Sequence, residues 1–263
     1  MKQSGDYRSE SFSSSRLATI DIGAASKMKH HVYAFIELDV TDARHILQDK
    51  KQQGEIISFN AWFIKCISKT VESCDSLHGI RKGKKNIIVF ADIDISIMIE
   101  RELNGVNVPL PYVLRKTNDK GIAEIQAEIR SGQTAAINDE GDYVLGETKN
   151  AFFMKVYYAL PGCCRRILWK NIIKRPFLTK KLMGTVMVSS VGMIGKINGW
   201  VLPVSVHPLS FTVGSIIQKP GVKDGNIELR DFLFLTVAID HNVIDGATAV
   251  RALTKLVEDG DGL

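Results

Sequence analysis

A histidine and an aspartate four residues apart follow an apolar strand near the carboxyl end of the chain. The stretch runs Ile239-Asp240-His241-Asn242-Val243-Ile244-Asp245-Gly246. A histidine at a strand end is held by a rigid sheet yet projects into a loop, and its ordinary pKa lies near neutrality, which suits a general base. Two interpretations stay open at this point. Either His241 is a base, or Asp245 simply caps the last helix and His241 is a turn residue.

The elements that would position this histidine mix strands and helices without strict alternation. Isoleucines at 93, 95, 97 and 99 alternate with other residues, which is typical of a strand. Apolar residues from Phe59 to Cys74 recur at helical spacing. We expect a flexible tail over 1–15 and one α+β domain over 16–263 around a central mixed sheet. Further predicted features are an edge or short strand over 108–114, strands over 31–40, 185–189, 211–217 and 232–239, a loop at Lys219-Pro220-Gly221 and a last helix over 247–258.

Several motifs in order resemble one enzyme family. The stretch Asp240–Gly246 is similar to the D-H-R-x-x-D-G signature of the dihydrolipoamide acyltransferases, the catalytic components of 2-oxo acid dehydrogenase complexes. The stretch Val108–Arg115 resembles that family's V-P-V-I-R strand, and Gly184–Gly192 resembles its G-T-F-T-I-S-S/N-L-G strand. Chloramphenicol acetyltransferase shares the fold and the H-x-x-x-D-G motif, so the resemblance implies a chloramphenicol acetyltransferase-like fold.

The resemblance implies an acyltransferase that moves an acyl group between coenzyme A and another thiol. His241 would remove the proton of the attacking thiol. Ser189 would donate a hydrogen bond to the oxyanion, an interaction typically worth ~3–4 kcal/mol, with Ser190 as the reserve choice. Asp245 would support the histidine loop by pairing with Arg16. The family's protomers form trimers, so we expect a homotrimer or a larger cubic assembly.

Three departures from the family qualify this prediction. Asn242 stands where the family usually has an arginine, and the segment 150–183 is longer, more basic and more apolar than the usual linker. No lipoyl domain or lipoylation site is visible, so we expect a stand-alone enzyme. A lipoyl or acyl-carrier domain would come from another protein, or another molecule would accept the acyl group.

Positive charge is concentrated in one part of the chain. Residues 148–223 contain twelve Lys or Arg and no Asp or Glu, although the whole chain has a formal net charge of +5. This pattern has three interpretations: a solvated helix face, a surface for coenzyme A or an acidic carrier through Arg165, Arg166 and Lys170, or an amphipathic helix on a membrane surface. Nucleic acid is not expected, because no recognition motif accompanies the charge.

Composition excludes several other classes of protein. The chain has 263 residues, of which 45% are apolar and 24% charged, as in ordinary globular proteins. Its four cysteines lack metal-site spacing, and no apolar run reaches the ~20 residues of a membrane helix. We therefore expect a cytoplasmic protein without a metal. A non-catalytic trimeric scaffold and an acyltransferase docked on a membrane through residues 150–183 are the alternatives.

Overall fold

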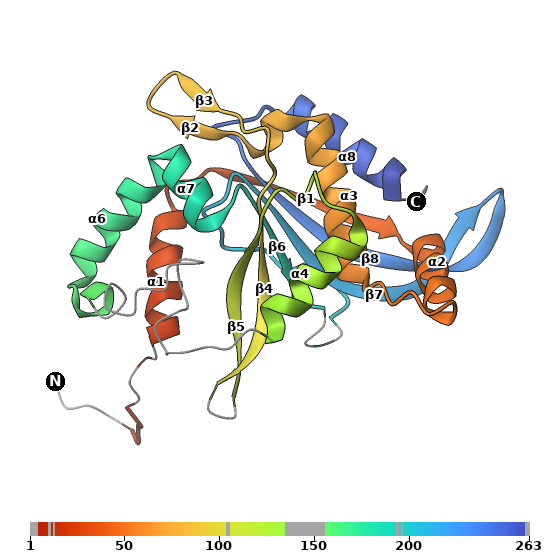
Figure 1. Ribbon diagram of the computed structural model, residues 1–263, viewed down its shortest axis with the longest axis horizontal. Helices are drawn as coiled ribbons and strands as arrows, with labels where there is room; N and C mark the ends of the chain where they lie inside the picture. Colours follow the sequence, from red (N-terminus) through yellow and green to blue (C-terminus); the bar gives the residue numbers. More distant parts are fainter. Residues whose placement is uncertain are drawn as a thin grey trace.

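The computed structural model describes residues 5–9, 12, 14–103, 106–134, 156–192, 195 and 197–260. Much of the tail predicted over 1–15, and residues 150–155 of the predicted insertion, lie outside these described residues. Within them, the chain is organised around a six-stranded sheet with the order β1-β8-β7-β6-β4-β5 (Figure 1).

The sheet is mixed, as the sequence predicted. Strand β6 is parallel to its two neighbours, β4 and β7, whereas the other pairs are antiparallel. Strand β5 is at the edge, where its prolines are tolerated. In sheet order the strands are β1 (His31–Asp39), β8 (Asn226–Asp240), β7 (Leu209–Lys223), β6 (Val186–Ser190), β4 (Ile95–Leu103) and β5 (Val106–Leu114). A separate ribbon pairs β2 (Ile80–Lys82) with β3 (Asn86–Ile88).

One face of the sheet carries the main apolar core. The alternating isoleucines of β4 place Ile95, Ile97 and Ile99 in that core, which confirms the predicted strand. Helices α3 (Phe59–Ser73), α4 (Ile122–Thr134) and α8 (Gly246–Gly260) contribute the other side of the same apolar cluster (Figure 1). Helix α2 (Thr41–Gln52) and the short helix η1 (Asp75–His78) complete this part of the molecule.

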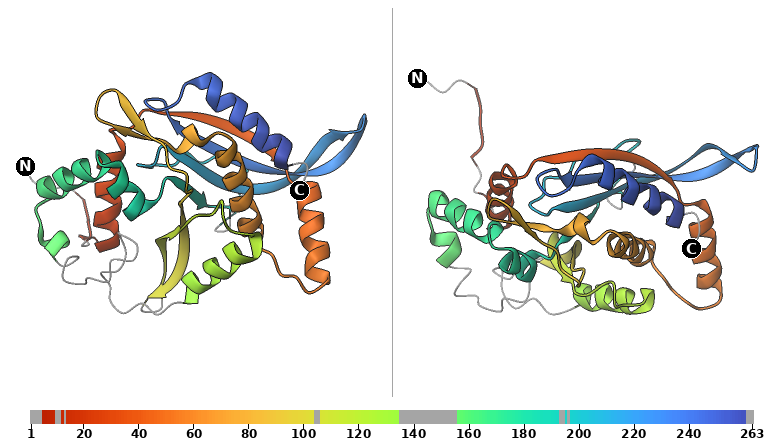
Figure 2. Two further views of the ribbon diagram at one scale, coloured as in Figure 1. Left: turned by 45° about the horizontal axis from the view of Figure 1, so that its top comes forward. Right: turned by 90° about the horizontal axis from the view of Figure 1, so that it is seen from above.

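A second, smaller apolar cluster lies where α1 (Ser14–Ser26), α6 (Gly162–Ile173) and α7 (Pro176–Met183) meet (Figure 2). Polar contacts also join these helices: the Trp169 indole N–H donates to the Tyr157 hydroxyl at 2.9 Å, and that hydroxyl donates to Asp21 at 2.7 Å. Arg165 donates to the same carboxylate at 2.7 Å. The N-terminal helix and the basic segment therefore pack as one unit.

The loop predicted at Lys219-Pro220-Gly221 is wrong, because β7 continues through it. The strand turns instead at Asp224 and Gly225, whose φ values are 51° and 81°. Beyond the irregularity between Val213 and Ile216, β8 is the only strand paired with β7 among the residues that the structure describes. Its other side is then an edge, where a proline that cannot donate a hydrogen bond does no harm.

The described residues contain neither a membrane-spanning helix nor a metal-binding cluster. None of the helices described is long and apolar enough to cross a membrane. Within the same part of the chain, no group of three or more His, Cys, Asp or Glu side chains is placed to hold a metal ion.

Candidate active site

The predicted histidine lies directly after β8, on an exposed turn. The backbone N–H of His241 donates to the carbonyl of His30 at 2.9 Å, which ties the turn to the start of β1. His241 lines a cavity of about 450 Å³ together with His30, His31 and Tyr33. The turn thus places His241 at a cavity, while its backbone is tied to the sheet.

A buried ion pair supports this turn from below. Lys29 lies 3.0 Å from Asp240, and their side chains are only 7% and 2% exposed. The Asp240 carboxylate also accepts from the side-chain amide of Asn242 at 2.9 Å. Burial alone raises the pKa of Asp240, but Lys29 and the hydrogen bonds from Asn242 and His30 outweigh it, so that the pKa lies below its ordinary value.

Sequence reasoning missed the Lys29–Asp240 pair and expected a different one. The expected pair joined Asp245 to Arg16, but within the described part of the chain Asp245 bonds instead to Thr248, accepting from its backbone N–H at 2.8 Å and its hydroxyl at 3.2 Å. Asp245 therefore caps α8. Lys29 is the cation that pairs with Asp240 beside the histidine turn, and the pairing of Asp245 with Arg16 stays a prediction.

Ser189 lies on the short parallel strand β6. Its neighbour Val188 belongs to the main core, so alternation points Ser189 to the opposite face and Ser190 toward the helices. Both serines line a cavity of about 290 Å³, which is distinct from the cavity at His241.

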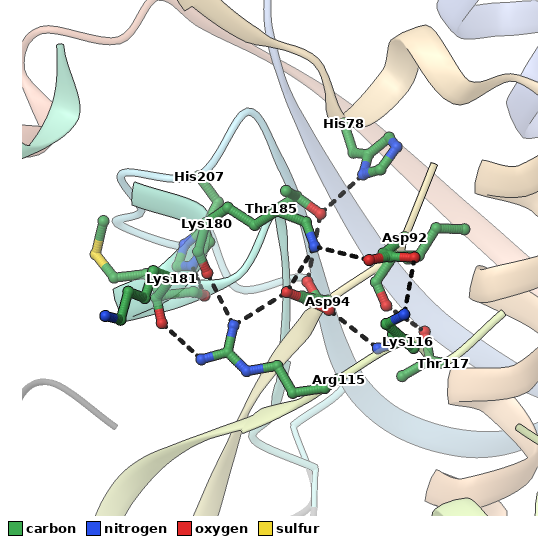
Figure 3. A network of polar contacts seen from close by, with 12 residues as sticks. His78, Asp92, Asp94, Arg115, Lys116, Thr117, Lys180, Lys181, Thr185 and His207 are labelled. Atoms are coloured by element: carbon green, nitrogen blue, oxygen red, sulfur yellow. Dashed lines mark hydrogen bonds and ion pairs between the residues drawn. The ribbon is translucent and has the colours of Figure 1, made fainter. Parts of the chain in front are cut away.

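A polar network holds the beginning of β6 (Figure 3). The backbone N–H of Thr185 donates to the carbonyl of Asp94 at 2.8 Å, and its hydroxyl lies 2.8 Å from Nδ1 of His78. The Asp94 carboxylate accepts from Arg115 at 3.0 Å and from Lys180 at 2.9 Å. Figure 3 shows the side chains of Arg115, directly after β5, and Lys180, on α7, converging on Asp94, which directly precedes β4.

The glycine before Thr185 is required by this close contact. Gly184 has a φ of 75°, and a Cβ there would lie 2.7 Å from the carbonyl oxygen of Asp94. The G-T sequence at the start of the strand is thus explained by backbone geometry, because only glycine fits both the conformation and the approach.

The structure does not bring Ser189 and His241 together in one chain. Register places Ser189 beside Thr212, and Thr212 beside Thr236 of β8. The four residues from Thr236 to Asp240 span about 13 Å along the strand, and two strand spacings add about 10 Å across the sheet. The serine and the end of β8 are thus about 16 Å apart, far beyond hydrogen-bond reach.

The predicted anion-binding cations separate into two groups. Arg165 is engaged internally, since it donates to Asp21 at 2.7 Å and to the carbonyl of Leu160 at 2.7 Å. Its side chain is 11% exposed, so Arg165 is a structural residue of the α1–α6 contact. Arg166 and Lys170 lie on the exposed side of α6.

Comparison with known proteins identifies the family to which the chain belongs. The chain matches the family described as 2-oxoacid dehydrogenases acyltransferase (catalytic domain) over residues 4–149 and 180–259. The chain belongs to that family, which confirms the resemblance and the enzyme class predicted from the sequence. The matched ranges leave out 150–179, where α6 lies.

Individual relatives agree with this assignment. The chain is 39% identical over 241 residues to the dihydrolipoyllysine-residue acetyltransferase component of a Staphylococcus epidermidis pyruvate dehydrogenase complex, covering 86% of this chain and 44% of the relative. It is 25% identical over 248 residues to the lipoamide acyltransferase component of the Bacillus subtilis branched-chain alpha-keto acid dehydrogenase complex, covering 88% and 48%. The chain thus spans about half the length of these curated relatives.

A solved structure shows the same fold. The cubic core of the pyruvate dehydrogenase multienzyme complex superposes with a TM-score of 0.70 at 16% identity, covering 98% of this chain and 93% of that chain. The predicted α+β fold class is confirmed by this likeness and by the mixed sheet.

Proposed function

We propose that this protein transfers an acyl group between coenzyme A and a second thiol, with His241 as the general base. The observation that carries the proposal is the placement of His241 on a turn fixed to β1 and open to a cavity. Family membership supports the reaction class. The second thiol would belong to a lipoyl or acyl-carrier domain of another protein.

The proposed transfer requires only the acyl donor and the attacking thiol. The imidazole of His241 takes the proton of the attacking thiol, and the thiolate adds to the thioester carbonyl. Ser189 donates a hydrogen bond to the oxyanion that forms. When the carbon–sulfur bond of the donor breaks, the leaving thiolate takes the proton back from the imidazolium, so the histidine is regenerated.

We further propose that the site is completed between two copies of the chain. A separation of about 16 Å in one chain leaves His241 without an oxyanion donor from its own β6. A trimer in which the histidine of one copy meets the serine of the next would solve this. The cubic core with the same fold, formed by another protein, supports such an assembly.

Mixed trimers test the whole proposal. His241→Ala and Ser189→Ala should each lose roughly 10²–10³-fold or more of the transfer rate, measured with acetyl-CoA and dihydrolipoamide. Co-expressed at 1:1, three quarters of the rings contain both variants, and each mixed ring holds one intact site in three. About a quarter of wild-type activity should therefore return.

The control repeats the mixture with Ser190→Ala in place of Ser189→Ala. If activity recovers only in the mixture that contains Ser190→Ala, Ser190 is the residue that donates the hydrogen bond to the oxyanion. If activity recovers with neither serine variant, the site is not shared between two copies of the chain. Full activity of His241→Ala would show that His241 is not the general base.

A membrane-surface enzyme is a second candidate, favoured by one observation. Ile167 and Phe177 are 60% and 64% exposed beside the basic residues of α6 and α7. If this surface binds a membrane, Ile167→Ser should reduce sedimentation with anionic vesicles, whereas a merely solvated surface should not bind them at all.

A further inference from the structure

A chain of polar contacts runs from a buried lysine to an exposed histidine beside the turn of His241. Lys29 pairs with Asp240 at 3.0 Å, and their side chains are only 7% and 2% exposed. The same carboxylate accepts from the side-chain nitrogen of Asn242 at 2.9 Å and from its backbone N–H at 3.2 Å. At the end of the chain, Oδ1 of Asn242 lies 2.9 Å from Nδ1 of His30, which is exposed. The residues on both sides of His241 are thus tied to the start of β1.

The chemistry of these groups fixes which nitrogen of His30 carries the hydrogen. Burial raises the pKa of Asp240, but Lys29 and the hydrogen bonds bring it below the ordinary value, so the carboxylate is ionised at neutral pH. An ionised carboxylate only accepts, so the amide nitrogen of Asn242 points at Asp240 and the amide oxygen at His30. That oxygen also only accepts, so Nδ1 of His30 is the donor. A neutral imidazole has one N–H, and its lone pair is then at Nε2.

Nε2 of His30 is available to accept a proton. Among the residues that the structure describes, this nitrogen has no hydrogen-bond partner. The chain is polarised in the direction that strengthens it as a base, because the carboxylate attracts the amide hydrogen and the amide oxygen becomes a better acceptor for Nδ1–H. An imidazole with one nitrogen held by an acceptor and the other open has the arrangement of a general base.

His30 also lies beside the proposed base. The backbone N–H of His241 donates to the carbonyl of His30 at 2.9 Å, one step beyond the last pair of β1 and β8, which joins His31 to Asp240. Both His30 and His241 line the cavity of about 450 Å³ at this end of the two strands. A thiol bound in the cavity therefore lies among histidines from both strand ends.

A third histidine of this cavity is engaged differently. Nε2 of His31 lies 2.9 Å from the carbonyl oxygen of His207, and because that oxygen only accepts, Nε2 carries the hydrogen. The lone pair of His31 is then at Nδ1, next to its own backbone, whereas the lone pair of His30 is at the outer end of the ring. The two neighbours are therefore not equivalent, and His31 is a matched control for His30.

We infer that His30 is a second proton acceptor at this cavity and that Asn242 is the residue that positions it. This role rests on the proposed function, because it concerns the same thiol transfer. Nε2 of His30 takes the proton of the attacking thiol, the thiolate bonds to the thioester carbonyl carbon, and the donor's carbon–sulfur bond breaks. The leaving thiolate then takes the proton from Nε2, which restores the neutral ring. His241 remains the main base, and His30 serves when His241 is absent or protonated.

The charges around His30 leave this role to the histidines. Among the described residues, the other titratable side chains that line the cavity belong to Lys29, His31, Tyr33 and His241. Asp240 accepts from the backbone N–H of His30 at 3.3 Å and neutralises Lys29. Without His241, a pH dependence in the range where histidines titrate is therefore due to His30 or His31, which substitution separates.

The transfer that remains without His241 tests the role of His30. With acetyl-CoA and dihydrolipoamide, kcat/KM of His241→Ala should rise with pH and level off above the range in which histidines titrate. Adding His30→Gln should lower the level rate about tenfold, because glutamine can still donate to Asn242 but accepts no proton. The rate should then rise without levelling off, as the free thiol ionises. Adding His31→Gln instead should leave the plateau in place.

The kinetic outcomes separate this role from the proposed function. If His30→Gln leaves the plateau in place, or if His31→Gln removes it as well, His30 is not the second acceptor, although His241 can still be the base. If His241→Ala is as active as the wild type, the proposed function of His241 is wrong, and loss of that activity on adding His30→Gln would make His30 the base.

NMR tests Asn242 without any need for activity. In protein with ¹⁵N-labelled histidine, above the pH range in which histidines titrate, the ring nitrogens of His30 should show the Nδ1–H tautomer. Asn242→Ala should give a mixture of the two tautomers at His30, leave His31 unchanged, and lower the plateau of His241→Ala about threefold. An Nε2–H tautomer of His30 in the wild type, or a tautomer that Asn242→Ala does not change, would overturn the positioning role whatever the activity.

Discussion

The two proposed halves of the active site are supported by different kinds of structure. Ser189 lies on a strand inside the sheet, and that strand begins at a buried network centred on Asp94. His241 lies on an exposed turn after β8, supported by one buried pair between Lys29 and Asp240. An oxyanion donor works only if its position is fixed, which suits Ser189 on a strand inside the sheet. A base must let two thiols enter and leave, which suits His241 on an exposed turn.

The largest effect on stability should come from a substitution in the network that holds the beginning of β6, the strand of Ser189. Asp94→Ala removes the carboxylate that pairs with Arg115 at 3.0 Å and leaves Lys180 with only the longer pair to Asp92, although the side chains of Arg115 and Lys180 are only 31% and 16% exposed. Breaking a pair of this kind costs about 3–5 kcal/mol. Urea unfolding should show that loss in the free energy of unfolding.

Asp92→Ala is the matched control for that experiment. Asp92 is 38% exposed and its ion pairs with Lys116 and Lys180 are 3.6 and 3.8 Å long, so its removal should cost below about 1 kcal/mol. Equal losses in the two variants would show that Asp94 has no special role in holding β6.

Acid should destabilise the protein through two buried histidines. Burial lowers the pKa of His78 and of His207 to about 4, from an ordinary value of 6.5. Between those pH values the unfolded chain binds protons that the folded chain does not, so stability is complete above about pH 6.5 and falls toward pH 4. The full loss is about 3 kcal/mol for each histidine.

Unfolding measured in urea at several pH values between 7.5 and 4.5 checks this window. His78→Asn should flatten the pH dependence by about half, whatever it does to stability at pH 7.5, because the remaining dependence comes from His207. An unchanged slope would mean that His78 is protonated in the folded protein. The carboxyls of Asp94 and Asp240, whose pKa values lie below 3.8, respond only at lower pH.

The smallest effect on stability should come from Asp245, which caps α8 just after the His241 turn. Asp245→Ala removes the acceptor for the Thr248 N–H and should lower the Tm by about 2–4 °C. Asp245→Asn keeps a capping oxygen and should restore most of the Tm. If Asp245→Asn recovers its Tm but does not catalyse acyl transfer, the carboxylate has a role beyond capping.

The sequence was most informative where a pattern is local. The alternating isoleucines identified β4, the prolines of 108–114 placed β5 at an edge, and the apolar run before His241 located the end of β8. Pro220 misled the prediction, because its strand is paired on one side only and the sequence does not reveal which strands have free edges.

Contacts between distant segments were beyond such patterns. Lys29 and Asp240 are 211 residues apart, and Arg165 is 144 residues from Asp21. No spacing rule links them, so the sequence assigned Arg165 to a ligand and chose Arg16 as the supporting cation. The sequence predicted no role for the basic turn at 81–85 either, because the turn lies beside Lys174 and Asn242 only in the folded protein.

The parallel strand β6 also has a consequence for how the chain folds. The pairs β4–β5 and β7–β8 are hairpins that close locally, but β6 must join Ile95 to Val186 across a loop of about ninety residues. Such non-local pairing is slow, because the loop-closure entropy is lost before the contacts form. We therefore expect the two hairpins to form first and β6 to dock between them later, so that the serine reaches its place only after both hairpins are present.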